Sequence, residues 1–272
     1  VSATILAGAQ IGQQPGQSVG SLSVIADSTL KAHNKVTAVV AGAAAVSANF
    51  AFTDVTPDVI ASVGVGANID VTGQVSVKAL AEHEAFADVL TLTGGGAAVG
   101  ASMSKATLDA VVSVVIAGVV TINAGAITLE ARSNHNGVNA SGKKARARAD
   151  AASVSAANSG SGTFVTANAL TDVSTTVGDD AVLTATGDIS IKSFGAHIAE
   201  ANGGAVSASL TAAIGGSIVD AHADGSTKVT VDADISTPQD LAIKAQALNT
   251  ATAIGLAGAA AAGVSLTGAV VT

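Results

Sequence analysis

Residues 73–79 read Gly-Gln-Val-Ser-Val-Lys-Ala, and four other segments of the chain follow the same seven-residue pattern. These segments begin at Gly20, Gly125, Gly187 and Gln239, so that successive starts are separated by 53, 52, 62 and 52 residues. Self-similarity at a nearly fixed period is typical of solenoids, propellers and other repeat arrays. The sequence therefore predicts a tandem array with a repeat of about 52 residues, one copy of which carries ten additional residues.

Each of these segments predicts a β-strand with one buried face. The second, fourth and sixth residues after the start are apolar or small, whereas the residues between them are mostly polar. This period of two places alternate side chains on opposite faces of a sheet. We expect an all-β fold, a β-solenoid (β-helix-like), in which the repeats stack with their strands aligned. One wide coil of about 52 residues and two coils of about 26 are both compatible with the sequence.

The repeats define the expected organisation of residues 1–272 as a single array. Residues 1–19 resemble the second part of a repeat, and residues 239–272 resemble the first part. A neighbour's residues 1–19 are therefore expected to complete residues 239–272, either in a separate copy or in the continuation of a longer chain. The complete repeats are expected at residues 20–72, 73–124, 125–186 (with the insertion at about 134–150) and 187–238.

The composition restricts the kind of core and the kinds of partner. Hydrophobic residues make up 49% of the chain, yet aromatic residues make up only 2%. Short side chains and 30 Gly let facing strands approach closely, which predicts a thin core rich in Ala, Val and Gly. The net charge of -8 argues against nucleic-acid binding, which uses a basic surface. Because the chain has no Cys, disulfides and thiolate metal sites are excluded.

One uncharged run, residues 253–272, is long enough to cross a membrane as a helix. Similar runs rich in Gly and Ala occur at matching places in earlier repeats, at residues 40–53 and 89–104, where they are bounded by charged residues. We therefore interpret residues 253–272 as part of the array and expect no membrane span.

The strand pattern, the Gly/Ala-rich runs and the Thr-Asp-Val corners at Thr53 and Thr171 resemble a known class of proteins. They are similar to the repeat (stalk) regions of giant bacterial surface adhesins of the filamentous-haemagglutinin-like and leukotoxin-like type. This resemblance covers nearly the whole chain. It implies an extracellular, cell-surface, fibre-forming segment of a bacterial protein, and it brings no catalytic residues.

Three histidines take the same place in their repeats, since His83, His135 and His197 each lie ten residues after the start of the seven-residue segment. In a stacked array they would form a row along one edge, and imidazole is a common metal ligand. Leu30 and Asn249 take this place in the first and last copies. We therefore favour a row of stacking or hydrogen-bonding side chains, with a metal site as the weaker alternative, and we expect no cofactor.

The insertion carries a third of the basic residues of the chain, namely Lys143, Lys144, Arg146 and Arg148. On an acidic protein such a cluster is a possible contact loop for a polysaccharide or a host surface. The simpler interpretation is a solvated loop.

The sequence favours a structural protein over an enzyme. Sugar-cleaving β-solenoids use carboxylates beside aromatic platforms, and this chain has neither Tyr nor Trp. No Gly-x-Ser-x-Gly segment with suitable His and Asp partners stands out. We predict a structural unit of an extracellular fibre that continues head-to-tail by strand stacking. The alternative is an adhesin module that binds a carbohydrate or a cell surface through the basic insertion.

Overall fold

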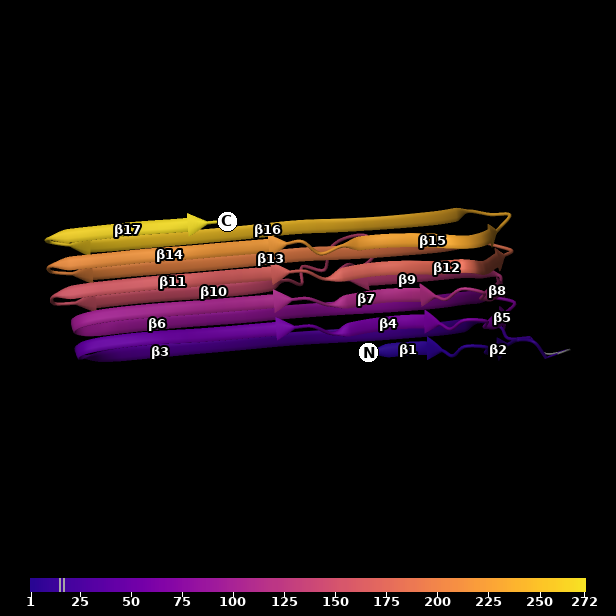
Figure 1. Cartoon of the computed structure of the whole chain (residues 1–272), viewed down its shortest axis with the longest axis horizontal. Helices are drawn as coiled ribbons and strands as arrows, with labels where there is room; N and C mark the ends of the chain where they lie inside the picture. The colour runs from indigo at the N-terminus through magenta and orange to yellow at the C-terminus, as the bar shows by residue number, and fades with distance from the viewer. Residues whose placement is uncertain (15, 17) are drawn as a thin grey trace.

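The computed structural model describes every residue of the chain except 15 and 17. Both of these residues belong to the expected partial repeat 1–19. The described part is all-β, without a helix, and its strands pair in parallel (Figure 1). The expectation of an all-β chain is therefore confirmed. The strands are β1 (Ser2–Ile5), β2 (Gln10–Ile11), β3 (Leu22–Val55), β4 (Asp58–Val63), β5 (Asn68–Asp70), β6 (Gln74–Leu108), β7 (Val111–Ile116), β8 (Thr121–Ala124), β9 (Ala126–Ser133), β10 (Ala145–Ser155), β11 (Asn158–Ala169), β12 (Asp172–Ala185), β13 (Ile189–Ser209), β14 (Ala212–Ala223), β15 (Thr227–Ser236), β16 (Leu241–Ala261) and β17 (Val264–Val271).

The strands form two parallel sheets. The smaller sheet contains eight strands, in the order β1-β4-β7-β12-β8-β5-β2 with β15 beside β12. The larger sheet contains nine strands, and β6 enters it twice, since its first part pairs with β9 and β10 and its last part pairs with β11. The long strands therefore bend into two legs, as the ribbons of β3 and β6 show at one end of the molecule (Figure 1).

In the first two layers the bend between the legs contains glycine. Gly95 has a φ of 157°, and a Cβ built on it would lie 1.7 Å from the carbonyl oxygen of Gly42 in the strand below. Any larger residue would push the two strands apart at this point, because an L side chain has no room there. Glycine therefore allows β3 and β6 to stack closely where both strands turn.

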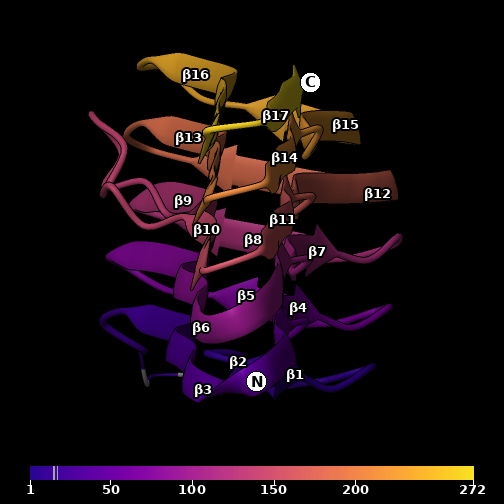
Figure 2. The ribbon, with the colours of Figure 1, turned by 90° about the vertical axis from the view of Figure 1, so that its left-hand side faces the viewer.

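The strand register follows the spacing of the seven-residue segments. Val75 pairs with Leu22 and with Ile127, and Ile189 pairs with Ile127 and with Leu241, so the five segments lie beside one another. We call each passage of the chain through both sheets a layer, with residues 20–72 as the first layer, followed by residues 73–124, 125–186 and 187–238. Figure 2 shows the layers stacked from the N-terminal to the C-terminal end.

The ten additional residues of the third layer are divided among three places. Ser133 and Ala145 are twelve positions apart, whereas their partners Ala81 and Ala85 are only four apart, so eight extra residues lie in segment 134–144. Compared with the same second layer, one more residue lies between Ser155 and Ser159, and another lies between Ala185 and Ile189. The expected insertion at about 134–150 is thus shorter than its predicted range, since residues 145–150 belong to β10.

Two hydrophobic clusters fill the space inside the layers. The first lies between the smaller sheet and the first leg of the larger sheet and contains mainly Val, Ile and Leu, among them Ile122 and Ile191. The second lies between the two legs of the larger sheet and consists mostly of Ala. At Gly203 a Cβ would lie 2.7 Å from Ser217 Oγ and 2.7 Å from Val219 Cγ2 of the facing leg. The legs are therefore close together in this half of the molecule.

Toward the bend, hydroxyl groups replace methyl groups inside the layers. Ser102 Oγ donates to Thr91 Oγ1 at 2.7 Å, and Thr163 Oγ1 donates to Ser217 Oγ at 2.8 Å. These four side chains are nearly or fully buried. Buried hydroxyls cost little free energy when they are hydrogen-bonded to one another, so the thin interior tolerates this polar end.

Candidate functional site

The first candidate site consists of the open strand edges at the two ends of the stack. At the C-terminal end, β15, β16 and β17 each pair with one strand only, namely β12, β13 and β14. At the N-terminal end the same is true of β3 and β1, which pair with β6 and β4. An edge strand presents unpaired N–H and C=O groups and is a template for another strand. Both ends of the described stack therefore present edge strands that have a pairing partner on one side only.

The C-terminal edge also exposes apolar side chains that belong to a core column. Ile243 lies in register above Ile191, which itself lies above Leu129. Ile191 and Leu129 are fully buried, whereas Ile243 is 51% exposed. The difference arises because no layer covers Ile243 in the single chain. The same holds for Leu241, which lies above the buried Ile189.

The two ends match each other in strand positions. A second copy stacked on the C-terminal end would place its β1 above β15 and its β3 above β16 and β17, by the register of the layers between them. Along this register Thr272 takes the ladder position of Phe52, and Val1 takes that of Val59. In such a stack, residues 239–272 and the second copy's residues 1–19 would share one layer and would leave the positions of residues 53–58 open.

The second candidate site is the outer surface around the four basic residues of the sequence prediction. Lys143 and Lys144 end segment 134–144, whereas Arg146 and Arg148 lie within strand β10. Ala145, Ala147 and Ala149 between and beside them point inward and are fully buried. Strand alternation therefore directs both arginines to the outer surface, and only the two lysines lie in a loop.

Each of the four basic side chains has a carboxylate partner. Lys143 Nζ lies 3.4 Å from Glu84 Oε1, and Arg146 lies 3.4 Å from Asp88 Oδ2, both in the layer below. Lys144 pairs with Glu200 in the layer above, and this hydrogen bond lowers the pKa of the Glu200 carboxyl group. Arg148 lies 2.7 Å from Asp150 in its own strand. Lys143, Lys144 and Arg146 therefore tie the third layer to its neighbours where segment 134–144 interrupts the ladder.

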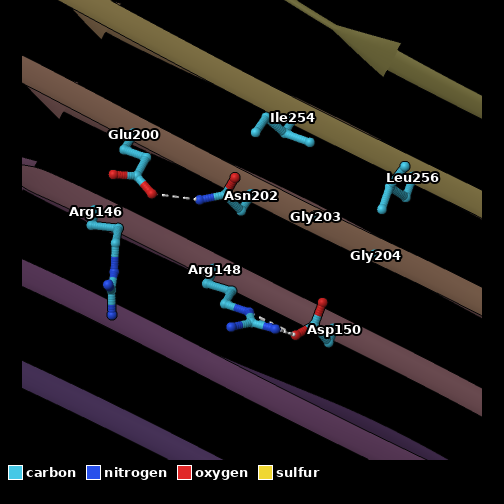
Figure 3. Close-up of a pocket in the computed structure, with 9 residues that line it drawn as sticks. All are labelled: Arg146, Arg148, Asp150, Glu200, Asn202, Gly203, Gly204, Ile254 and Leu256. Carbon is cyan, nitrogen blue, oxygen red and sulfur yellow. Dashed lines mark hydrogen bonds and ion pairs between the residues drawn. The ribbon is translucent and has the colours of Figure 1, made fainter.

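A shallow pocket of about 290 Å³ lies beside these ion pairs, between strands β10, β13 and β16 (Figure 3). Figure 3 shows Arg148 bonded to Asp150 and Asn202 bonded to Glu200 on its walls, with Ile254 and Leu256 above them. The walls carry both charges and lack an aromatic platform. The guanidinium of Arg146 lies outside on the ring of Phe86, 4.7 Å from the ring centroid.

The structure does not bring the three predicted histidines together. His83 and His197 point inward and are buried, with exposures of 0% and 1%. His135 follows the point where the chain leaves the ladder, and its ring stacks on Phe194 with centroids 5.1 Å apart. Asn134 takes the place beside His83, donating to the His83 carbonyl at 3.1 Å and accepting from its N–H at 2.8 Å. The row of histidines is therefore broken at the third layer.

The surroundings of the histidines favour their neutral form. Burial lowers the pKa of His83 to about 4, and its Nε2 lies 3.1 Å from Ser28 Oγ. Burial also lowers the pKa of His197, whose Nε2 lies 3.3 Å from Thr227 Oγ1. The pKa of His135 is lowered by burial and by the charges of Arg132 and Lys244. In the part of the chain that the structure describes, no group of three His, Cys, Asp or Glu side chains is placed to hold a metal ion.

The uncharged run at residues 253–272 forms the end of β16 and strand β17. No helix among the described residues is long and apolar enough to cross a membrane. Comparison with models of protein families, with curated proteins and with solved structures finds no match to this chain.

Proposed function

We propose that the chain is a β-solenoid with one flattened coil per repeat of about 52 residues, and that it serves as a structural segment of a fibre. The fibre grows head-to-tail, because each end of the stack accepts the complementary end of a neighbour. That neighbour is a second copy or the continuation of a longer chain. The resemblance to adhesin stalks supports an extracellular, cell-surface position in a bacterium.

The single observation that carries this proposal is the exposure of Ile243. Its column is buried in the layers below, so the side chain is placed for a core that the single chain does not complete. A neighbouring copy would place Val24 above it, in the column that runs through Val77, Leu129 and Ile191. Burial of apolar area yields about 25 cal/mol per Å², and every strand added also closes a backbone ladder.

The ion pairs favour this structural role over the alternative of an adhesin that binds a carbohydrate through the basic residues. A polysaccharide would have to displace Glu84, Asp88, Asp150 and Glu200 from the cations that they contact. The cross-layer pairs instead stabilise the stack at its interruption. Networks of partly exposed ion pairs contribute more than isolated surface pairs, which contribute about 0–1 kcal/mol each.

The test replaces Ile243 by Lys. In the single chain the ammonium group reaches water from this half-exposed position, so folding is nearly unaffected; in a stack the charge would be buried without a partner. We expect wild-type protein to form fibres whose length grows with concentration, and Ile243→Lys to stay as single chains in sedimentation and electron microscopy.

Ile254→Lys is the matched control, because Ile254 is 50% exposed on the same strand but points outward. It should form fibres as the wild type does. Fibre formation by Ile243→Lys equal to that of the wild type would exclude stacking through this edge. Loss of surface attachment without any change in fibre length, after replacement of Lys143 and Lys144 by Gln, would support the carbohydrate-binding alternative instead.

A further inference from the structure

The outer surface of the second leg of the larger sheet is a continuous uncharged face. It is formed by the outward-pointing alternate residues of segments 44–50 in β3, 97–103 in β6, 158–164 in β11, 212–218 in β14 and 264–270 in β17, and we call it the outer face. The structure describes all twenty of these positions, and none carries a charged residue. Charged residues begin one row further on, with Lys105 and Asp220.

The outer face alternates between rows of small and large side chains. Counted from the bend, the first row is mainly Ala, and the second row contains Val46, Val99 and Ile214. The third row contains only Ala and Gly, and the fourth row contains Phe50, Met103, Phe164, Ile218 and Val270. Val264 in the first row and Gly160 in the second row depart from this alternation. Most of the large side chains are exposed, Val46 to 75% and Ile214 to 56%, whereas Met103 is half-buried.

The outer face carries two open grooves. One, of about 510 Å³, lies over the third row, with Gly162, Gly216 and Gly268 on its floor and Phe164 on its wall. The other, of about 500 Å³, surrounds Gly160, where the second row lacks a side chain between Val99 and Ile214. The face therefore carries apolar ridges and an apolar groove that run along the direction in which the layers stack, and the ridge of the second row is interrupted at Gly160.

We propose that the outer face is a lateral interface between two copies of this chain. In this interface a two-fold axis runs parallel to the stacking direction and lies between the second and third rows. Rotation about this axis reverses the order of the four rows, so the order small, large, small, large in one copy meets the order large, small, large, small in the other. The second row of one copy then faces the third row of its partner, and the fourth row faces the first. Large side chains enter grooves lined by small ones, as in closely packed sheet interfaces. The charged rows stay outside the contact.

The area of the face limits how strongly single chains pair. Seven residues at about 3.3 Å and five strands at about 4.8 Å cover roughly 550 Å² on each copy. Stable interfaces typically bury about 800 Å² on each partner, so two isolated chains pair only weakly. The axis is parallel to the stack, so neighbouring copies in two fibres of equal polarity repeat the same contact. The inference therefore rests on the proposed fibre, because a longer fibre repeats the contact and multiplies the lateral area that two fibres bury.

Val99→Lys tests the interface, since it places a charge in the second row. Val206→Lys is the matched control, because Val206 is 55% exposed, compared with 50% for Val99, but points outward from the first leg. Fibre width and fibre length are measured in the same electron micrographs. We expect paired fibres for the wild type and for Val206→Lys, and single fibres of unchanged length for Val99→Lys. Single wild-type fibres, or paired Val99→Lys fibres, would overturn the proposal.

A second experiment tests the alignment of the rows. Val99 of one copy faces Ala101 of its partner in the proposed arrangement, so Ala101→Asp protein mixed with Val99→Lys protein should restore paired fibres. Failure of the mixture to pair would overturn this arrangement. If the wild type forms no fibres, sedimentation of concentrated protein separates the two proposals. Dimers that the Val99→Lys substitution abolishes would support the lateral interface and would count only against the end-to-end growth of fibres. Wild-type protein that sediments as single chains would overturn the lateral interface.

Discussion

The close approach of the two legs at Gly203 makes a quantitative prediction. A Cβ at this position would lie 2.7 Å from Ser217 Oγ and from Val219 Cγ2, and 3.1 Å from Val165 Cγ2. Carbon atoms in contact prefer separations of about 3.5–4.0 Å, so Gly203→Ala forces the legs apart by close to 1 Å. Overpacking of this kind costs about 1–3 kcal/mol, offset by about 0.5–1 kcal/mol because Ala has less backbone entropy to lose. We expect a net loss of about 1–2 kcal/mol.

Gly204→Ala, one residue further along β13, is the control for this substitution. Its Cβ would point outward and meet only the carboxylate of Asp150, at 2.8 Å, on the outer surface, where Asp150 and its partner Arg148 can shift together. We expect its free energy of unfolding to equal or slightly exceed that of the wild type. Urea unfolding followed by circular dichroism, at concentrations where sedimentation shows single chains, compares the variants. If Gly203→Ala is as stable as Gly204→Ala, the legs do not pack as closely as described.

Two further predictions concern the titratable groups. His83→Asn should flatten the pH dependence of the free energy of unfolding. The pKa of His83 is lowered from 6.5 to about 4 in the folded protein, so the unfolded chain takes up a proton first as the pH falls. The wild type is therefore fully stabilised above pH 6.5 and loses roughly 3 kcal/mol as the pH falls to about 4. Parallel pH profiles of the two proteins in urea unfolding would contradict this. Glu200→Gln should cost about 0.5–1 kcal/mol at pH 7, because it removes the carboxylate that Lys144 contacts. This loss of stability should shrink in 1 M salt, and it should also shrink as the pH falls through the lowered pKa of Glu200. Glu82→Gln is the control, because Glu82 is an exposed carboxylate. An equal loss of stability in Glu82→Gln would contradict the role of the Lys144–Glu200 pair.

The strand register was the part of the fold that the sequence predicted well. The five seven-residue segments pair at the spacings read from the sequence, because apolar residues at every second position fix which face of a strand is buried. Half-length coils, which the sequence left open, are absent from the pairings of the described residues. The sequence predicted a core rich in Ala, Val and Gly; Ala predominates between the two legs, whereas Val is the commonest residue in the other half, together with Ala, Ile and Leu.

The candidate site was predicted less well. Arg146 and Arg148 were assigned to an insertion, although the alternation from Ala145 to Ala149 is itself a strand pattern. Their partners in other layers could not be identified before the register was known. His135 shares its sequence position with His83 and His197, but the chain has left the ladder at Ser133, so position in the repeat no longer determines direction. The outer face was missed, although its rows are visible once the strands are aligned.

The length of segment 134–144 has no effect on the spacing of the strands on either side of it. The chain leaves the ladder after Ser133 and returns at Ala145 with both neighbours still in register, so eight extra residues leave the stacking unchanged. The backbone of Asn134 already closes the exit, since its N–H donates to the Ala81 carbonyl at 2.9 Å and its carbonyl accepts from the Ser141 N–H at 2.8 Å. A foreign peptide grafted between residues 136 and 139 would therefore be displayed once per molecule at a fixed height, which makes the segment a natural attachment point for engineered epitopes.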